Sequence, residues 1–457
     1  MPLAVVLVVL VVLFCKIKCK FHWNVALISA TLLFAMLWLA IYSYFFTLPQ
    51  KEFVGKTRDA TVVVMETGKS YMQELVSAKL KVTKVNGEEI KPFFVWCNGF
   101  DYYEIGDIVN SKLLFEKIDN PVSLRNSNID KIVMQVKQEG ETVQMGTQGG
   151  FEMFFKKLQV KASSILQLNV SGENGKICTA IVTGDKSELS KDVKMQFRQA
   201  GLSHILVVSG LHLGIIAGFA TLLLGKIFKN KKFSTFLSIL FVLVFVCFTG
   251  FTPSTVRAGV VICFVLIGKA CHFETDAVTS MALALILLLL SNPYACLDAG
   301  LLLSFSSTLG LVFLSYFKHE YIEQLKTNKW FCFAKPFLVP LFVMVATLPV
   351  MIYINGNVSI VGILANIIVV PLLTPVLIMG VITLITAVLT GMSDIAFMFG
   401  FFEKVFIDII RFFVNLANKV PYGTISVGGI YAFCICACIY GLAFFLYKNK
   451  KYKAMAV

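Results

Sequence analysis

The sequence contains little charge and little histidine for its length. Only 15% of its 457 residues are charged and five are histidines, whereas 57% are hydrophobic and the mean hydropathy is +0.78. Typical soluble domains carry about 25% charged residues, so this composition excludes an ordinary soluble protein. The sequence also contains no P-loop and no HxHxD-type histidine cluster. We therefore expect no cofactor, no bound metal and no nucleotide-driven step within this chain.

The twelve cysteines form no metal-binding pattern. Ten lie in or beside apolar segments, where cysteine packs as a small apolar residue. The alternating triplet Cys434, Cys436 and Cys438 has no histidine or carboxylate neighbours. Cys97 and Cys178 lie in the more polar stretch of the chain. They could form a disulfide if that stretch faces an oxidising compartment, although no spacing rule supports the pair.

The net charge of +14 comes largely from lysines in short segments between apolar runs. Such clusters lie at Lys16–Lys20, Lys226–Lys232, Lys318–Lys329 and Lys448–Lys453. Lysine-rich loops of this kind mark the cytoplasmic side of a membrane protein. Between Lys51 and Lys157 the chain has 15 basic and 15 acidic residues, so this stretch is neutral. Membrane topology therefore explains the net charge, which gives no support for DNA binding.

Apolar runs long enough to cross a bilayer recur outside residues 50–200. A hairpin over residues 1–48, with its lysine loop inside, predicts that residues 50–150 are extracytoplasmic. Pro371 and Pro375 within 360–390 predict two helices or one broken helix, and 394–418 resembles an interfacial helix. Further spans are expected near residues 205–225, 234–250, 257–271, 278–291, 301–317, 337–354 and 425–447. The sequence thus predicts a polytopic α-helical integral membrane protein with about ten spans.

Residues 50–150 are typical of a small β domain. Five β-rich segments, separated by Gly, Asn or Asp turns, begin near Thr61, Leu75, Pro92, Ile108 and Asp130. Five short strands in so little chain favour a small barrel, and an OB-like fold is the natural candidate. Residues 151–200 predict a connecting region, whose helix over 151–168 either lies at the membrane surface or packs as an ordinary helix. Residues 201–457 then form the transmembrane domain.

Polar and small residues interrupt the apolar spans at three places, where they often line a cavity or a transport path. Small residues also pack helices against one another, and buried histidines are often satisfied within a core. Arg257 either snorkels or lines a wet path, and Asp298 either pairs with it or caps a helix. From the residues alone these alternatives stay open. The three places contain Gly184, Asp185, Ser209, Gly210 and His212; Gly250, Ser254 and Arg257; and Asn292, Asp298 and Ser304.

The same three places resemble the ComEC competence family. The family's Gly-Asp, Gly-Leu-x-His and Ser-Gly-Leu-His elements are similar to Gly184 with Asp185, the run from Gly201 to His204, and the run from Ser209 to His212. The elements occur in the family's order, and an N-terminal hairpin followed by an external OB-like domain is also the family's arrangement. Further similar positions are Gly250, Ser254, Arg257 and Ala258; Asn292, Pro293, Asp298, Gly300, Leu303, Ser304 and Phe305; and Ala365, Asn366 and Pro371.

The resemblance implies a channel in the bacterial inner membrane that imports single-stranded DNA during natural transformation. Ser209 and Gly210 would let helices approach around a narrow pore, while Arg257 and His212 would contact the strand. The expected DNA path comprises Asp185, His204, Ser209, Gly210, His212, Ser254, Arg257, Asp298, Ser304 and Asn366. External contacts are expected from Trp96, Phe100, Tyr102 and Tyr103, although such rings could equally fill the barrel.

The family also implies partners that act with this chain. Longer members continue into a metallo-β-lactamase-like domain that degrades the second strand, whereas this sequence stops at Val457. We interpret it as a short form, natural or truncated, which is not an enzyme and acts beside a separate nuclease. An extracytoplasmic DNA receptor and a cytoplasmic ATP-driven DNA translocase are the other expected partners. The alternatives are a secondary transporter of a small solute and an inactive structural relic of the family.

Overall fold

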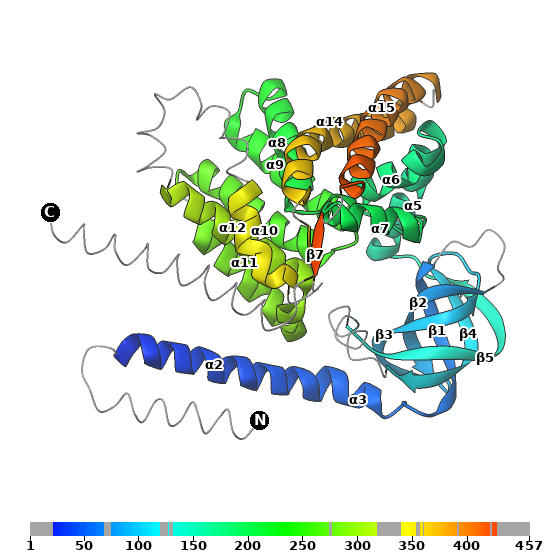
Figure 1. Ribbon diagram of the computed structural model, residues 1–457. Helices are drawn as coiled ribbons and strands as arrows, with labels where there is room; N and C mark the ends of the chain where they lie inside the picture. Colours follow the sequence, from blue (N-terminus) through cyan, green and yellow to red (C-terminus); the bar gives the residue numbers. More distant parts are fainter. Residues whose placement is uncertain are drawn as a thin grey trace, which may run out of the picture. The chain divides into compact units, whose positions relative to one another are not determined.

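The computed structural model describes residues 22–67, 75–118, 127, 131–273, 277–317, 340–352, 357–359, 361–390, 393–420 and 423–426. The first predicted span and almost all of the last one lie outside these residues. Contacts divide the chain into two compact units. The first comprises residues 1–149 with 286–298, and the second comprises residues 150–285 with 299–457. Figure 1 shows the elements of both units.

The first unit contains a closed five-stranded barrel with the strand order β1-β2-β3-β5-β4. Neighbouring strands are antiparallel except for β3 and β5, which are parallel. Alternate residues such as Val62, Leu80 and Val95 point inward and are fully buried, as the period of two requires. This confirms the five strands and the barrel expected from the sequence. Their bounds are β1 Thr57–Thr67, β2 Leu75–Val85, β3 Glu88–Asp101, β4 Asp107–Lys117 and β5 Ile132–Thr147.

A helical segment precedes the barrel in the same unit. It comprises α2 (His22–Tyr42), a π-helical turn (Ser43–Thr47) and α3 (Leu48–Lys51). Residues 29–51 are long and apolar enough to cross a membrane. The Trp38 indole N–H donates to the Leu289 carbonyl oxygen at 3.1 Å, and the Lys91 ammonium lies 3.8 Å from the centre of the Phe46 ring. These contacts tie the segment to residues 286–298 and to the barrel.

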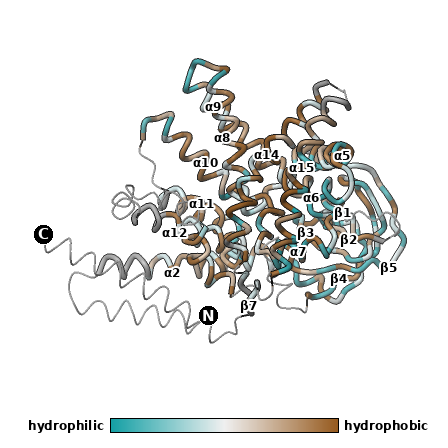
Figure 2. The backbone as a smooth tube through the Cα atoms, turned by 45° about the horizontal axis from the view of Figure 1, so that its top comes forward, coloured by the Kyte–Doolittle hydropathy of each residue, from teal (hydrophilic) through white to brown (hydrophobic). Residues whose placement is uncertain are grey.

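The second unit is helical, and its core draws on most of its helices. Figure 2 shows that apolar residues dominate helices such as α10 and α14, whereas the barrel strands are mixed in hydropathy. The bounds of its helices are α5 Phe151–Asn169, α6 Gly172–Thr183, α7 Lys191–Gln199, a 3-10 helix Ser203–Leu206, α8 Gly210–Ile227, α9 Lys231–Phe248, α10 Pro253–Cys271, α12 Ala299–Phe317, an apolar helix Pro340–Ile352, α14 Val361–Thr390 and α15 Ser393–Asn418. The helix α11 (Ala277–Ser291) begins in this unit and ends in residues 286–298 of the first unit, which also contain a 3-10 helix, Pro293–Leu297. A two-stranded sheet pairs β6 (Asn357–Ser359) with β7 (Thr424–Ser426).

Five helices among the described residues are long and apolar enough to cross a membrane. They are the segment 29–51, α8, α9, α10 and the central part of α14, and three shorter apolar helices add to them. Their exposed side chains are largely apolar, which suits contact with lipid. The helices predicted near 205–225, 234–250, 257–271, 278–291, 301–317 and 337–354 are confirmed as helices. The composition and these helices together identify a membrane protein.

The predicted break in the segment 360–390 is wrong. Residues 361–390 form one continuous α-helix, α14, with Pro371 and Pro375 inside it. Proline removes a backbone donor and crowds the preceding turn, so each one weakens the helix locally. The flanking residues Val369, Leu373 and Val376 are fully buried in the core of the second unit. Burial along both sides of the prolines therefore holds the helix together where the local rule predicted an interruption.

Candidate functional site

The Gly-Asp motif forms the turn that ends α6. Gly184 has a φ of +82°, and a Cβ added there would lie 3.1 Å from Val208 Cγ2. Only glycine adopts this conformation without strain, so the chain reverses here and packs against the segment before α8. The Asp185 carboxylate accepts hydrogen bonds from the Ser187 backbone N–H at 3.0 Å and from the Ser163 hydroxyl of α5 at 3.3 Å. Asp185 therefore links the turn to α5.

Ser209 and His212 begin α8 as a pair. The backbone N–H of Ser209 donates to His212 Nδ1 at 3.3 Å, and the Ser209 hydroxyl lies 2.9 Å from the same atom. The pair satisfies a backbone donor at the helix start, as capping residues do. His212 is fully buried, and its Nε2 has no hydrogen-bond partner within the part of the chain that the structure describes. The sequence predicts that His212 contacts single-stranded DNA. Because the side chain is buried, such a contact would require α8 to move.

The start of α10 lies against the start of α8. The Ser254 hydroxyl donates to the Val208 carbonyl oxygen at 2.8 Å, and a Cβ added at Gly210 would lie 3.5 Å from the Ala258 Cβ. Pro253 occupies the first turn of α10, where its missing N–H leaves no bond unmade. Arg257 follows one turn later and is almost fully buried. The structure thus brings together the Gly-Asp turn, the Ser209–His212 pair and the Ser254–Arg257 element, which we call the motif cluster.

His204 and Asn366 lie on segments that contact each other beside the motif cluster. His204 is in the 3-10 helix after Gly201, and a Cβ added at Gly201 would lie 2.9 Å from Gly362 Cα at the start of α14. The Asn366 side chain donates to the Gly362 carbonyl oxygen at 2.7 Å. The surrounding protein lowers the pKa of His204 by partial desolvation, although its side chain reaches solvent. Even at an ordinary pKa this imidazole would be mostly neutral at pH 7.

The remaining predicted path residues lie elsewhere. Asp298 ends the 3-10 helix Pro293–Leu297 and belongs to the first unit. Ser304 is on α12, which contacts α10 within the second unit. The structure therefore places Ser304 on a neighbour of the motif cluster, and it assigns Asp298 to the unit that contains the barrel.

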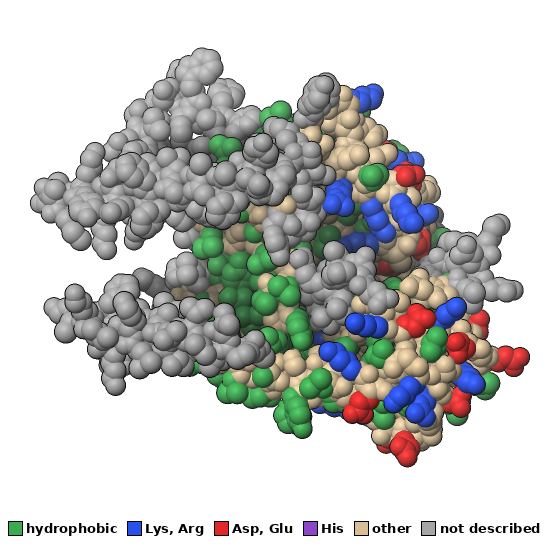
Figure 3. Space-filling model, turned by 60° about the horizontal axis from the view of Figure 1, so that its bottom comes forward, with side chains coloured by type: hydrophobic (Ala, Val, Ile, Leu, Met, Phe, Trp, Pro, Cys, Tyr) green, Lys and Arg blue, Asp and Glu red, His purple; other side chains and the backbone are tan. Residues whose placement is uncertain are grey.

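The barrel presents a mixed aromatic and basic surface on β2 and β3. Lys79 is paired with Trp96 and Lys81 with Phe94 across the two strands, so their side chains share one face. The Lys79 ammonium lies 5.2 Å from the centre of the Phe94 ring. We call Lys79, Lys81, Phe94 and Trp96 the β2–β3 face. Basic and acidic side chains are otherwise interspersed on the molecular face drawn in Figure 3.

The four aromatic residues predicted to bind DNA outside the membrane have different surroundings. Trp96 is half-buried on the β2–β3 face, and Tyr102 is exposed. Phe100 is fully buried inside the barrel, which is the alternative that the sequence left open. Tyr103 packs on Phe100 with ring centres 6.0 Å apart and donates from its hydroxyl to Thr142 at 2.6 Å. The structure also adds Phe94, which lies beside Trp96 on the sheet surface.

A disulfide between Cys97 and Cys178 is ruled out in this structure, because both cysteines are free. Cys97 lies in the barrel core and Cys178 in the core of the second unit. Cys178 instead contacts Glu403, with 2.6 Å between Sγ and Oε1. This carboxyl group could not be singled out from the sequence, because residues 394–418 resemble an interfacial helix. Its spacing from Gly400, Ile407 and Ile410, which are all buried, was the available signal.

The apolar helices, the small barrel and the motif cluster define a multi-helix membrane protein with a small β domain. A family model described as "Competence protein" matches residues 181–451, more than half of the chain, and the chain belongs to this family. The matched region begins within α6 and includes the whole motif cluster.

Two curated relatives are similar to part of the chain. "ComE operon protein 3" of Bacillus subtilis is 26% identical over 242 residues, which are 53% of this chain and 30% of that protein. "Recombination protein 2" of Haemophilus influenzae is 24% identical over 244 residues, which are 50% of this chain and 30% of that protein. The matched region thus spans under a third of each relative's length. No solved structure matches the chain.

Gly184→Ala should weaken the motif cluster. Alanine at a φ of +82° is strained by about 1–3 kcal/mol, and its methyl group would crowd Val208. We expect a lower midpoint of thermal unfolding in detergent and a lower transformation frequency. Gly214→Ala on α8 is the control, because a Cβ there meets nothing within 4 Å and alanine favours the helix. Equal effects of the two substitutions would contradict the strained-turn account.

Proposed function

We propose that this chain forms a channel in the bacterial inner membrane that passes single-stranded DNA into the cytoplasm during transformation. The observation that carries the proposal is the motif cluster, in which α8 and α10 begin side by side next to Asp185 and the buried Arg257. Helix starts carry partial positive charge, which suits phosphate. A guanidinium beside them adds a full positive charge. These are the groups that a phosphate backbone needs once it leaves water.

The barrel is proposed to be an OB-like domain that receives DNA on the extracytoplasmic side. In OB folds the face of strands 2 and 3 binds single strands, with bases stacked on aromatic rings. The β2–β3 face has the corresponding position and chemistry, since Phe94 and Trp96 offer rings and Lys79 and Lys81 can meet phosphates. The domain as a whole is neutral, so its affinity for DNA would rest on the β2–β3 face.

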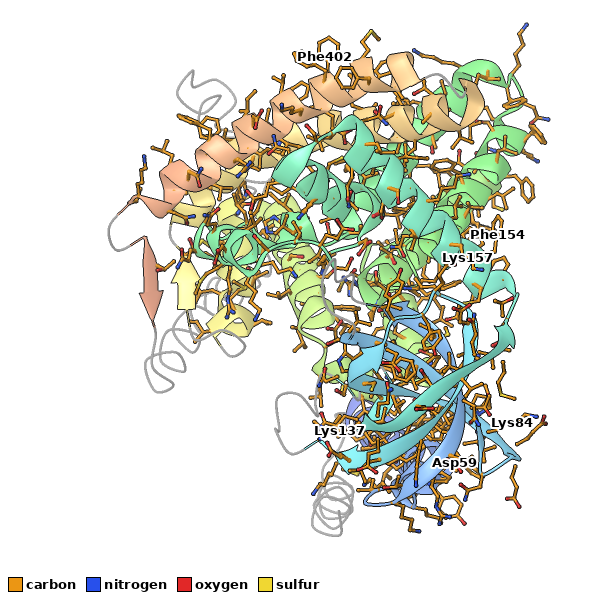
Figure 4. The ribbon with its side chains drawn as sticks, turned by 90° about the vertical axis from the view of Figure 1, so that its right-hand side faces the viewer. Asp59, Lys84, Lys137, Phe154, Lys157 and Phe402 are labelled. Atoms are coloured by element: carbon orange, nitrogen blue, oxygen red, sulfur yellow. The ribbon has the colours of Figure 1, made fainter. Side chains whose placement is uncertain are left out.

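The proposed topology has about ten crossings, with the lysine-rich loops before α14 inside. Within it α15 lies at the membrane interface. Its exposed apolar side chains, including Phe401, Phe402 and Phe412, form a stripe, while Lys404 and Asp408 lie to one side and are exposed to solvent. Figure 4 shows Phe402 pointing outward from the helix. A helix with one apolar and one charged exposed side suits the boundary between headgroups and acyl chains.

The proposal assigns transport, and no catalysis, to these residues. A cytoplasmic ATP-driven translocase would pull the strand, an extracytoplasmic receptor would deliver it, and a separate nuclease would degrade its complement. A secondary transporter of a small solute and an inactive relic remain outcomes of the first test below. If the protein were a solute transporter or an inactive relic, deletion of its gene would leave natural transformation unchanged.

Replacing Arg257 should reduce natural transformation without changing the uptake-independent route. A deletion strain is complemented with wild type, Arg257→Ala or Lys269→Ala, at matched protein levels. Because a charged hydrogen bond contributes about 1.5–3 kcal/mol, Arg257→Ala should lower transformation by linear DNA at least about tenfold. Lys269→Ala is the control, because Lys269 is exposed in the last turn of the same helix.

Electroporation of the same strains measures recombination and survival apart from uptake. It should give equal numbers of transformants for all of them. Unchanged natural transformation in the deletion strain would refute the DNA channel, and unchanged transformation in Arg257→Ala alone would refute the role of that residue.

The double substitution of Phe94→Ala and Trp96→Ala should weaken binding of single-stranded DNA by the purified chain. Stacking contributes about 1–3 kcal/mol per base, so the dissociation constant should rise at least about tenfold. Fluorescence anisotropy of a labelled oligonucleotide at fixed salt measures the change. Val143→Ala is the control, since it removes an exposed side chain of β5 that is paired with Asn110 of β4. If both variants bind as tightly as wild type, the face does not receive DNA.

A further inference from the structure

Glu403 is a carboxylic acid buried in the apolar core of the second unit. It lies on α15 and has no exposed surface. Its neighbours one and two turns along the helix, Ile407 and Ile410, belong to the core cluster. Glutamate is almost never fully buried unless it is paired, because an ionised carboxylate loses several kcal/mol of hydration in such a place. This side chain is also remote in sequence from the elements that define the motif cluster.

Three helices enclose the carboxyl group. Cys178 of α6 contacts Oε1 at 2.6 Å, whereas Oε2 has no hydrogen-bond partner among the described residues. On α14, a Cβ added at Gly380 would lie 2.8 Å from Oε1, so the carboxyl group occupies space that only glycine leaves open. The site is therefore built: α6 supplies a thiol, α14 supplies the space and α15 supplies the acid.

No described group near the carboxyl supplies a compensating positive charge. On α6 the titratable group that faces Glu403 is Cys178, and α14 contains no titratable residue. The charged side chains of α7, and Glu152, Lys157 and Lys161 of α5, are exposed, while Lys156 of α5 is half-buried beside Gly250. On α15 itself Lys404 and Asp408 are exposed, and Arg411 pairs with Glu173 at 2.6 Å.

Desolvation therefore controls the ionisation of Glu403. Burial raises its pKa from 4.5 to about 8, although the hydrogen bond with Cys178 acts in the opposite direction. The carboxyl group is then mostly protonated at pH 7. Burial and the adjacent carboxyl also raise the pKa of the Cys178 thiol, so the thiol stays protonated when the acid ionises.

We propose that Glu403 is a proton-binding site that couples proton occupancy to the packing of α6 against α14 and α15. With the proton bound, a neutral carboxyl fills the space beside Gly380. When the proton leaves to water, an ionised carboxylate remains with the Cys178 thiol as its described donor, and hydration of this charge loosens the contact between the helices. Because α6 ends at the Gly184 turn, its displacement moves one part of the motif cluster. This last step rests on the proposed function, whereas proton binding does not.

Infrared spectroscopy of the full chain in lipid vesicles measures the protonation directly. The carboxylic C=O band of wild type at pH 7, compared with Glu403→Gln, should contain one component that the variant lacks. This component should disappear with a midpoint near pH 8, a shift of more than three units from the ordinary glutamate value. Loss of the component near pH 4.5, or no difference between the two proteins at pH 7, would overturn the proposal.

Alkylation of Cys178 measures the coupling to helix packing. Its rate is compared with that of Cys97, which is equally buried but lies in the barrel core, by peptide mass spectrometry between pH 6.5 and 9. The ratio of the two rates should rise at least about tenfold in wild type, as expected if ionisation exposes the thiol, and stay constant in Glu403→Gln. A ratio that changes equally in both proteins would refute the coupling.

Cys178→Ser gives a second variant if Glu403→Gln does not fold. A hydroxyl group donates a stronger hydrogen bond to a carboxylate than a thiol does, so it should lower the infrared midpoint by at least about half a unit. An unchanged midpoint would contradict the contact. If DNA uptake fails in the deletion test but the infrared midpoint stands, the proton site survives without the proposed transport function.

Discussion

The hydrogen bond from the Ser254 hydroxyl to the Val208 carbonyl oxygen joins the two helix starts on which the candidate DNA path depends. In apolar surroundings each backbone carbonyl needs a partner, and Val208 lies just before α8, where no helical bond is available to it. Ser254 supplies that partner from the first turn of α10. The same segment packs against Gly184, so one short stretch positions the end of α6 and the starts of α8 and α10.

This arrangement explains why small and polar residues gather there. Gly184 permits the turn, Gly210 permits close approach to Ala258, and Ser209 with His212 satisfies the first backbone donors of α8. Each residue has a structural reason for its position. Under the proposed function, the same geometry places two positive helix ends close to Arg257, which suits a polyanion.

The barrel was predictable from sequence to within a few residues, because alternation of apolar and polar side chains reports directly which side of a strand is buried. The span helices were equally clear, because their length and apolar character leave few alternatives. The continuity of α14 was not predictable. Pro371 and Pro375 weaken the helix locally, which the sequence shows, whereas the packing of Val369 and Leu373 that offsets this cost depends on the tertiary structure.

The candidate site was predictable as a set of motifs but not as a cluster. Nothing local indicates that Ser254 reaches Val208, which is 46 residues earlier in the chain. Glu403 and Cys178 are 225 residues apart, and their contact depends on how three helices pack. The same limit left a disulfide between Cys97 and Cys178 open, because the burial of these cysteines in separate cores cannot be inferred from composition.

Site-specific crosslinking during transformation tests the central claim most directly. A photo-crosslinking amino acid is placed at Leu211, in the first turn of α8 beside the motif cluster, or at Leu222, which is exposed near the other end of the same helix. Cells then take up labelled DNA and are illuminated. The account predicts that DNA is crosslinked at Leu211 and not at Leu222. Crosslinking at neither position, or equally at both, would contradict a DNA path through the motif cluster.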